Sequence, residues 1–329
     1  MPTVLAFEKP LAELKAKLDA ALAKAHAIGV ETSPEAEALA CQLAGERQRI
    51  FSALTPWQKV LLARHPDRPY TRDYIAAFVD DFTELHVDRQ FADDASIVGG
   101  IGWIEGRKAM VIGTQKGRDT ASNVACNFGC PFPEGYRKAL RLMKLAARFR
   151  LPILTLIDTP GAFPGTQGEE RHVAAAIAVN LREMFNLPVP VVSAVIGEGG
   201  SGGALALGVA NRILIMEYAY YSVISPEGCA AILWKDRAAA DKAAAALRLT
   251  SSDLLALGIA DGVVPEPPGG AHIDPAGAAD RLRDAVVAQF AQLEKLSEVE
   301  LIGQRYGKFR ALGVYESTPP LPLEPPPLR

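Results

Sequence analysis

The most glycine-rich stretch of the chain, Gly197–Ala204, has the features of a site for a negatively charged oxygen. Its sequence, Gly-Glu-Gly-Gly-Ser-Gly-Gly-Ala, places five glycines within seven residues, directly after an apolar run. Glycine removes side chains where a backbone approaches another group closely or takes a positive φ. A helix that begins here offers unpaired N–H groups and the positive end of its dipole. Each preorganised donor of this kind lowers a reaction barrier by roughly 3–4 kcal/mol.

Two other interpretations of the same glycine-rich turn compete with an oxyanion site. The turn can serve only to pack a strand closely against a helix, or it can hold a nucleotide phosphate. A P-loop ends in Gly-Lys-Ser/Thr, but Ala204 and Leu205 stand at those positions. The spacing of the glycines also differs from the dinucleotide-binding fingerprint. Phosphate binding is thus the least favoured of the three, and the close-packing interpretation stays open.

A second turn, Asp158–Gly165, also follows an apolar run and precedes a predicted helix. Its sequence, Asp-Thr-Pro-Gly-Ala-Phe-Pro-Gly, contains two Pro-Gly-type corners, and these favour a rigid, open loop. In α/β sheets, ligands bind at the carboxyl ends of the strands, where such a loop lies. Pro160, Gly161 and Ala162 are therefore candidate substrate-binding residues. Asp158 is either catalytic or a cap of the turn, and capping is the commoner role.

Other reactive side chains match known catalytic motifs less well. Cys126 and Cys130 are spaced Cys-x3-Cys without a second pair, so we predict no metal site on this chain. Ser201 lacks the Gly-x-Ser-x-Gly spacing of a nucleophile elbow. Glu198 and Glu227 can act as general acids or bases, or can simply orient their turns.

Basic residues gather in two places. A predicted helix over 135–150 carries four cations at offsets of four, three and four, which places them on one face; they are Arg137, Arg141, Lys144 and Arg148. This face is either solvated or a docking surface for an acidic partner or a phosphorylated cofactor. Lys116 and Arg118 form a small basic turn that is a candidate contact for phosphates or a partner.

The elements that must position these residues alternate between strands and helices after about residue 95. The N-terminal part, by contrast, is rich in Ala, Leu, Glu and Lys at helical spacing over 11–28 and 34–63. Short apolar or β-branched runs predict strands, of which the first two form a hairpin; they lie at 97–104, 108–114, 151–157, 189–196, 213–216 and 221–224. Predicted helices separate and follow these strands, at 135–150, 169–185, 204–209, 226–235, 238–249, 251–258 and 280–296. This alternation predicts an α/β domain with crossover connections.

Composition limits the class of protein. The 329 residues are 49% hydrophobic and 22% charged, which is typical of a globular protein. The formal net charge of −3 argues against a nucleic-acid binder, so we expect no DNA partner. We find no signal-peptide pattern and no apolar run of the roughly 18–20 residues that span a bilayer, and the four cysteines are scattered. We therefore expect a cytoplasmic protein without a membrane partner.

Several segments, in this order along the chain, resemble one family. They are Ala63–Tyr70 with Ala92–Gly100, Pro133–Leu142, Asp158–Gly165, Gly197–Leu205 and Tyr221–Ala230. Together they are similar to the carboxyltransferase alpha subunits of bacterial and plastid acetyl-CoA carboxylase. The resemblance runs from about residue 5 to about residue 312.

The resemblance implies a crotonase-like (ClpP/crotonase) α/β fold, in which ββα units wind into a superhelix, with an N-terminal helical extension. The expected division is a helical arm over 1–65, a carboxyltransferase domain over 66–313, and a proline-rich, disordered tail over 314–329. The implied partner is a beta subunit with a zinc ribbon, in an alpha2-beta2 heterotetramer. A biotin carboxyl carrier protein and a biotin carboxylase complete the implied complex.

The implied reaction transfers a carboxyl group from carboxybiotin, held on the carrier protein, to acetyl-CoA, and so makes malonyl-CoA for fatty acid synthesis. The resemblance places an oxyanion hole for biotin at the backbone N–H groups of Gly202 and Gly203. Gly199, Gly200 and Ser201 complete the biotin-binding turn. The freed biotin nitrogen then serves as the base, so the chain needs no catalytic side chain.

Two other functions remain as alternatives. The chain can be a self-sufficient crotonase-type enoyl-CoA hydratase or isomerase, which would carry acid–base residues and thioester recognition on one chain. It can also be a non-enzymatic subunit that recruits an acidic partner through its basic helix face.

Overall fold

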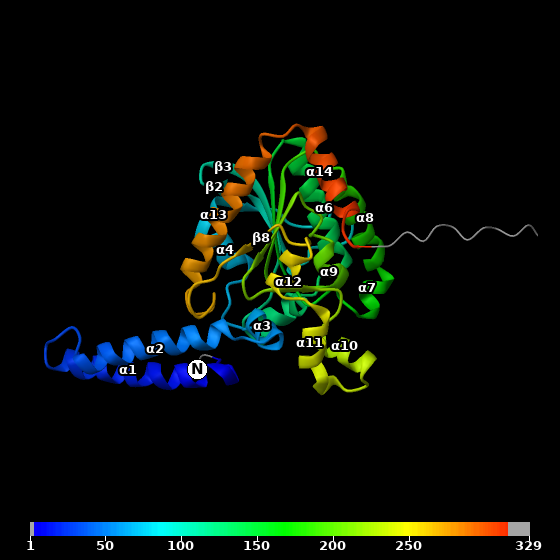
Figure 1. The fold of residues 1–329 in the computed structure, drawn as a ribbon. Coiled ribbons are helices and arrows are strands. Elements are labelled where there is room, and N and C mark those ends of the chain that lie inside the picture. Colours follow the sequence, from blue (N-terminus) through cyan, green and yellow to red (C-terminus); the bar gives the residue numbers. More distant parts are fainter. Residues whose placement is uncertain (1–2, 315–329) are drawn as a thin grey trace, which may run out of the picture.

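The computed structural model describes residues 3–314, and one mixed β-sheet lies at the centre of the protein (Figure 1). Its strand order is β1-β2-β3-β4-β5-β6-β8, and β7 pairs with the end of β5. The first three strands are antiparallel neighbours, whereas every pairing from β3 onward is parallel. The strands are β1 (Asp80–Glu84), β2 (Ile97–Ile104), β3 (Arg107–Thr114), β4 (Ile153–Thr159), β5 (Val191–Gly200), β6 (Arg212–Met216), β7 (Tyr220–Ser222) and β8 (Gly262–Val264).

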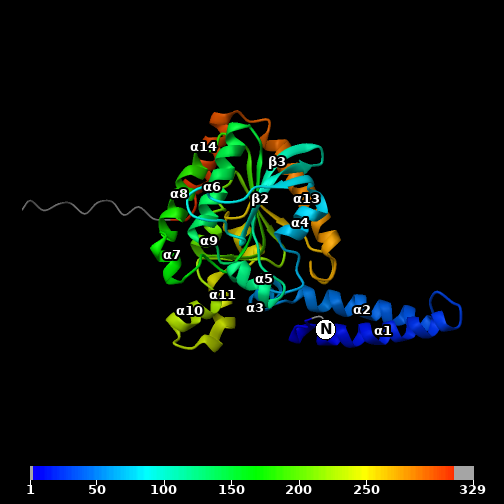
Figure 2. The ribbon, with the colours of Figure 1, turned by 180° about the vertical axis from the view of Figure 1, so that it is seen from behind.

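Helices cover both faces of the sheet, with α6, α8 and α14 on one side and α4 and α13 on the other (Figures 1 and 2). The helices are α1 (Lys9–Ala27), α2 (Pro34–Ser52), α3 (Pro56–Ala63), α4 (Thr71–Phe78), α5 (Thr120–Ala125), α6 (Pro133–Arg148), α7 (Thr166–Glu170), α8 (Val173–Phe185), α9 (Ser201–Leu205), α10 (Pro226–Leu233), α11 (Ala240–Leu247), α12 (Ser251–Ala256), α13 (Pro275–Leu293) and α14 (Glu298–Arg310). Short 3₁₀ turns lie at η1 (Ala6–Glu8), η2 (Asn127–Gly129) and η3 (Arg237–Ala239). Within residues 3–314, no helix is both long enough and apolar enough to cross a bilayer.

The two central strands, β4 and β5, are buried along their whole lengths. Parallel strands that helices cover on both faces read as continuous apolar runs, which is why both strands were predictable. The predicted hairpin at β2 and β3 is confirmed, and so is the long helix α6. Their packing brings the carboxyl ends of β4 and β5 side by side, because the strands pair in parallel.

Two predicted helices are interrupted. The predicted helix over 34–63 is two helices, because Thr55 caps a new start at Pro56: its side chain accepts a hydrogen bond from Gln58 N at 3.2 Å. The predicted helix over 169–185 breaks at His172, whose φ of 65° is left-handed.

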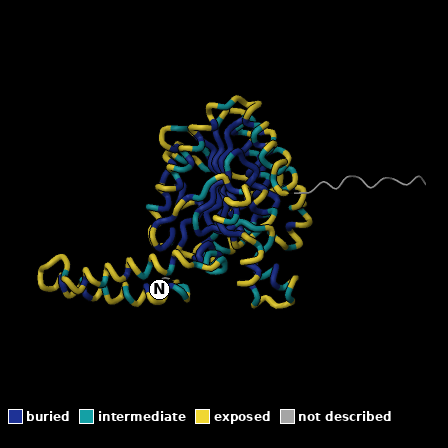
Figure 3. Tube along the Cα trace, viewed as in Figure 1, coloured by how far each residue is buried: buried dark blue, intermediate teal, exposed yellow. Residues whose placement is uncertain are grey.

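The N-terminal helices α1 and α2 form a hairpin that projects from the sheet-containing body, with most of its surface exposed (Figures 1 and 3). The expected division at residue 65 stays a prediction, as does the boundary at 313. The expected tail lies almost entirely outside the described residues.

The sequence patterns did not predict α14, although its Arg305 is fully buried. Arg305 donates hydrogen bonds to the carbonyls of Met184, Leu187 and Val189 and to the side-chain oxygen of Asn211, at 2.6–3.0 Å. The backbone carbonyls lie in the last turn of α8 or just after it, and the dipole of a helix favours a cation at this C-terminal end. Burial lowers the pKa of Arg305 to about 10, so the group stays charged at neutral pH.

Candidate active site

The two candidate turns of the sequence meet at the carboxyl ends of β4 and β5. A Cβ atom added to Gly203 would lie 2.5 Å from Ala162 N and 2.5 Å from the carbonyl carbon of Gly161. At Gly200 an added Cβ would collide with the Pro160 carbonyl. The segments 160–162 and 200–203 are therefore in backbone-to-backbone contact, which only glycine permits at these two positions.

The glycine-rich segment differs from the predicted turn in two ways. Gly197–Gly200 belong to β5, and α9 begins at the next residue, so strand and helix join without a loop. None of the five glycines has a left-handed φ; the left-handed residue is Ser201, at 55°. The glycines serve close approach instead: a Cβ at Gly197 would lie 2.5 Å from the Asp158 carboxylate. In the second turn, Gly161 does have a positive φ, of 152°.

The amides of Gly202 and Gly203 lie in the first turn of α9, where N–H groups have no acceptor within the helix. Neither amide donates to the turns, loops or caps of the described residues. Gly202 has open space around it, since an added Cβ would only touch Ile177 at 3.7 Å. These two donors are available to an oxygen bound beside α9.

Ser201 and Gly202 line a cavity of about 590 Å³ that lies next to these amides. Its other walls are mostly apolar and come from distant parts of the chain: Leu205, Ile213, Tyr221, Ser222, Val223, Leu254, Leu257, Ile259, Phe309, Ala311, Leu312, Gly313 and Val314. A volume of this size is typical of small-molecule sites.

Beneath the glycine segment lies a cluster of charged side chains centred on Glu198. One carboxylate oxygen of Glu198 accepts from Lys116 Nζ at 2.7 Å, and the other from Arg64 Nε at 2.9 Å and from the Tyr220 hydroxyl at 2.9 Å. Arg64 also donates to Glu227 at 2.6 Å. Burial alone would raise the pKa of Glu198, but the charges of Lys116 and Arg64 outweigh it and lower this pKa to about 2. Glu198 is thus a permanent anion that holds its neighbours in place, and it is too weak a base to carry a proton at neutral pH.

Asp158 joins the two strand ends. Its Oδ1 accepts hydrogen bonds from the backbone N–H of Glu198 at 2.9 Å and from Lys116 Nζ at 2.7 Å. Because the carboxylate is buried and its Oδ1 already has two hydrogen-bond donors, the structure favours a positioning role over the catalytic one.

The basic turn of Lys116 and Arg118 is tied to the protein. Burial alone would lower the pKa of Lys116, but the carboxylates of Asp158 and Glu198 outweigh this effect and raise the pKa above its ordinary value. Arg118 donates to the carbonyls of Pro66 and Arg68 and pairs with Asp73. A phosphate would have to compete with these partners, and the predicted phosphate or partner role of this turn stays a prediction.

The two candidate thiols are unpaired, and no role for them follows. Cys126 is buried and Cys130 half-buried, and burial raises the pKa of both. Sequence spacing missed a different cluster, in which donor atoms of Glu8, His65 and His272 lie within 4.8 Å of one another. Both ring nitrogens of His65 have hydrogen-bond partners, in Thr3 O and Asp67 N, and His272 Nε2 pairs with Glu8, so the cluster joins the N-terminal residues to the body. The expected absence of a metal on this chain stays a prediction.

Arg64 and Tyr220 are site residues that sequence reasoning also missed. Arg64 directly follows the predicted helix over 34–63, and its side chain hydrogen-bonds to Glu198, which is 134 positions away in the sequence. Its segment does fall within Ala63–Tyr70, one of the motifs that carried the family resemblance, and this was the one available signal.

Comparison with known proteins identifies the family. A family model described as "Acetyl co-enzyme A carboxylase carboxyltransferase-like" matches residues 4–313. The chain belongs to this family. It is 54% identical over 315 residues to the acetyl-coenzyme A carboxylase carboxyl transferase subunit alpha of Xanthomonas campestris pv. campestris (strain B100), covering 96% of this chain and 99% of that protein. It is 52% identical over 311 residues to the subunit of the same name from Thermus thermophilus, covering 94% and 98%.

Solved structures of other proteins share the fold of this family member. Transcarboxylase 12S aligns with a TM-score of 0.56 at 22% identity, over 69% of this chain and 42% of that one. A Pseudomonas malonate decarboxylase hetero-tetramer aligns with a TM-score of 0.55 at 16% identity, over 66% and 87%. Together with the mixed sheet, these likenesses confirm the predicted crotonase-like α/β fold.

Proposed function

We propose that this family member is the alpha subunit of an acetyl-CoA carboxyltransferase, which makes malonyl-CoA from acetyl-CoA and carboxybiotin. The family match and the identity to named alpha subunits support this function. The structural observation that carries it is the contact between the two glycine-containing segments at 160–162 and 200–203, beside an apolar cavity.

The chemistry requires that negative charge be stabilised on two oxygens. When the carboxyl group leaves biotin, charge develops on the ureido oxygen, and deprotonated acetyl-CoA carries charge on its thioester oxygen. In our proposal the amides of Gly202 and Gly203 donate to the biotin oxygen, because they are free and lie at the positive end of α9. Ser201, Gly199 and Gly200 shape this side of the site, and Pro160, Gly161 and Ala162 shape the other.

The charged cluster supports a mechanism without a side-chain base on this chain. Glu198, the acidic residue within the glycine segment, has a pKa of about 2 and three hydrogen-bond donors around it. Glu227 is paired with Arg64. Proton abstraction from acetyl-CoA is accordingly assigned to the biotin nitrogen that the leaving carboxyl group frees.

The proposal includes a beta subunit that supplies the thioester side of the site and carries the structural zinc. An alpha2-beta2 assembly, a biotin carboxyl carrier protein that delivers the substrate and a biotin carboxylase complete the system. Residues 1–65 are proposed to form a separate arm of the alpha subunit, and 66–313 its carboxyltransferase domain.

Reconstitution tests this function. The full chain, its beta partner and the mixture are each assayed for malonyl-CoA formation from acetyl-CoA and carboxylated carrier protein. We expect product only from the mixture, at a rate that saturates at equal subunit concentrations. Malonyl-CoA formation by this chain alone would contradict the shared site.

The competing hydratase or isomerase function is tested with the same preparation. Pure chain is mixed with an enoyl-CoA, and the loss of the conjugated double bond is followed by absorbance. We expect no hydration, because the acidic residues beside the glycine segment are engaged in ion pairs. Turnover at ordinary enzymatic rates would favour the hydratase.

A further inference from the structure

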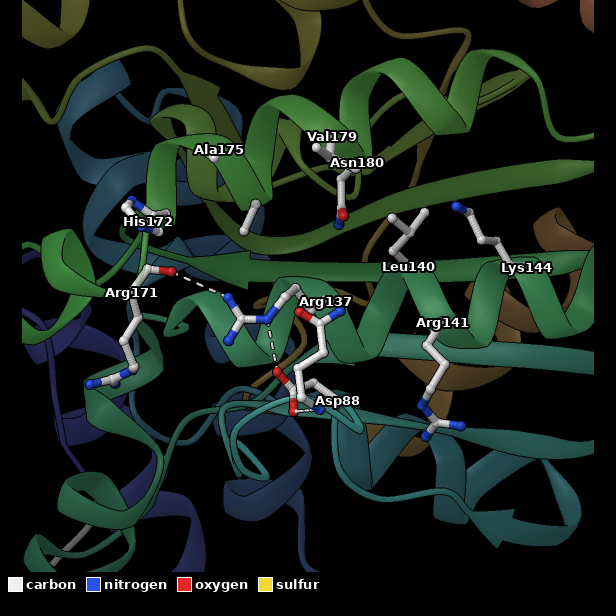
Figure 4. A pocket seen from close by; sticks show the side chains of 12 residues that line it. Asp88, Arg137, Leu140, Arg141, Lys144, Arg171, His172, Ala175, Val179 and Asn180 are labelled. Atoms are coloured by element: carbon white, nitrogen blue, oxygen red, sulfur yellow. Dashed lines mark hydrogen bonds and ion pairs between the residues drawn. The ribbon is translucent and has the colours of Figure 1, made fainter.

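A pocket of about 510 Å³ lies between α6 and α8, apart from the cavity beside α9 (Figure 4). Basic side chains of α6 line one wall and small apolar residues of α8 the other. The lining residues are Asp88, Gln90, Arg137, Leu140, Arg141, Lys144, Arg171, His172, Ala175, Ala176, Val179 and Asn180. The pocket thus includes three of the four cations that the sequence placed on one helix face.

The cations of the pocket outnumber its carboxylates. Arg137 pairs with Asp88 at 2.8 Å, and Lys144 pairs with Glu183 at 2.9 Å. Arg141 differs: it donates to the carbonyls of His86 and Val87, and within the described residues it has no carboxylate within 4.0 Å. Burial and the nearby Arg89 lower the pKa of Arg141, whereas Asp88 and Asp93 raise it. An anion bound in the pocket would give Arg141 the close negatively charged partner that the described residues do not supply.

The floor of the pocket contains an unused hydrogen-bond acceptor. Asn180 is 1% exposed, and its Nδ2 donates to the carbonyls of Tyr136 at 3.1 Å and Ala206 at 3.3 Å. These two acceptors fix the orientation of the amide, and its buried Oδ1 has no hydrogen-bond partner among residues 3–314. Leaving a buried acceptor unpaired is costly, and a ligand with an N–H or O–H donor would satisfy it.

We propose that this pocket binds a phosphorylated nucleoside. Its phosphate lies against Arg141, its ring system between Leu140 and Val179, and a ribose hydroxyl or base amino group donates to Asn180. The volume falls in the range of small-molecule sites, and an apolar wall with a few polar groups is typical of them. A flat basic face would instead favour an acidic protein segment. The proposal does not depend on the carboxyltransferase function, since it concerns different residues.

Calorimetric titration of the full chain tests the proposal with four probes. These are ADP, adenosine 3′,5′-bisphosphate (the nucleotide end of CoA), adenosine and inorganic pyrophosphate. We expect one or both nucleotides to bind, and adenosine and pyrophosphate to bind at least tenfold more weakly. Preference for ADP indicates a free nucleotide as the ligand, and preference for the bisphosphate indicates CoA. Absence of binding by both nucleotides, or pyrophosphate binding as tight as that of ADP, overturns the proposal.

Two matched pairs of variants locate the site. Ala175→Trp fills the pocket, whereas Ala178→Trp changes another exposed alanine of α8 that does not line it. Arg141→Gln removes the least compensated cation, whereas Arg148→Gln removes an exposed one two turns along α6. We expect Ala175→Trp to abolish binding and Arg141→Gln to weaken it about ten- to hundredfold, with both controls within twofold of the parent.

Thermal melting identifies variants that fail to fold. Because Ala175 is an exposed residue, we expect the Ala175→Trp protein to fold, and this variant still tests the site if Arg141→Gln does not fold. Nucleotide binding that survives Ala175→Trp unchanged would place the ligand elsewhere and refute the assignment.

Discussion

Adjacent alanine substitutions in α9 should have opposite consequences, because Gly202 and Gly203 face different surroundings. At Gly202 an added Cβ would meet only Ile177 at 3.7 Å, an ordinary contact. At Gly203 it would meet the backbone of Gly161 and Ala162 at 2.5 Å, so the two segments must separate by about 0.9 Å to reach a 3.4 Å contact. The second turn cannot easily retreat, because Gly161 N donates to the Thr159 hydroxyl at 3.1 Å, and Thr159 itself donates to the Gly129 carbonyl at 2.6 Å.

A displacement of this size has a measurable cost. Misplacing a catalytic group by about 1 Å lowers a rate about 100-fold, and overpacking destabilises a fold by about 1–3 kcal/mol. We expect Gly203→Ala to lose about 100-fold in kcat in the reconstituted carboxyltransferase, and Gly202→Ala to stay within about threefold. Size-exclusion chromatography with the beta subunit and urea unfolding show whether each variant still folds and assembles. Equal rates for the two variants, whether both high or both low, would refute the steric argument.

Three further predictions concern the supporting residues. Glu198→Gln leaves the buried cations Lys116 and Arg64 undercompensated, so urea unfolding should show a loss of about 3–5 kcal/mol. The pKa of Glu198 in the folded protein, about 2, is below its ordinary value of 4.5. The ionised carboxylate therefore stabilises the fold fully above about pH 4.5, and this contribution is lost as the pH falls toward 2. In acid unfolding, the Glu198→Gln protein should lose less stability than the parent over that range. Arg305→Met removes the hydrogen-bond donor of several buried carbonyls, so it should lower the thermal midpoint by more than the exposed control Arg310→Met does. The kcat of Arg305→Met, measured below its thermal midpoint, should stay close to that of the parent.

The sequence predicted most of the layered fold, because its signals are local. The hairpin β2–β3, the strand β4 and the amphipathic helix α6 each follow from periodicity within about 16 residues. The break at Thr55 was missed, although its capping box and Pro56 were visible, because helical composition continues across it. The helix α14 was missed because its buried Arg305 reads as a surface residue.

At the candidate site, the sequence indicated the two segments but not their geometry. A glycine run normally ends a strand, yet Gly199 remains in the ladder between Thr159 and Tyr221. The charged cluster was beyond local patterns, since Arg64, Lys116 and Glu198 come together only through the fold. Contacts over such separations leave no periodic trace in a single sequence.

The central claim is that this chain stabilises charge with backbone amides and without a side-chain acid or base. Replacing Gly202 with proline removes one N–H in the first turn of α9, and Gly202→Ala is the matched control that keeps the N–H. Because proline also restricts the left-handed Ser201 before it, urea unfolding of both variants is measured alongside. The measurement is kcat for malonyl-CoA formation by each variant in the assembled alpha–beta complex. The account predicts a loss of roughly 100- to 1000-fold for Gly202→Pro relative to Gly202→Ala, with assembly intact. A proline variant within a few-fold of the alanine variant would contradict it.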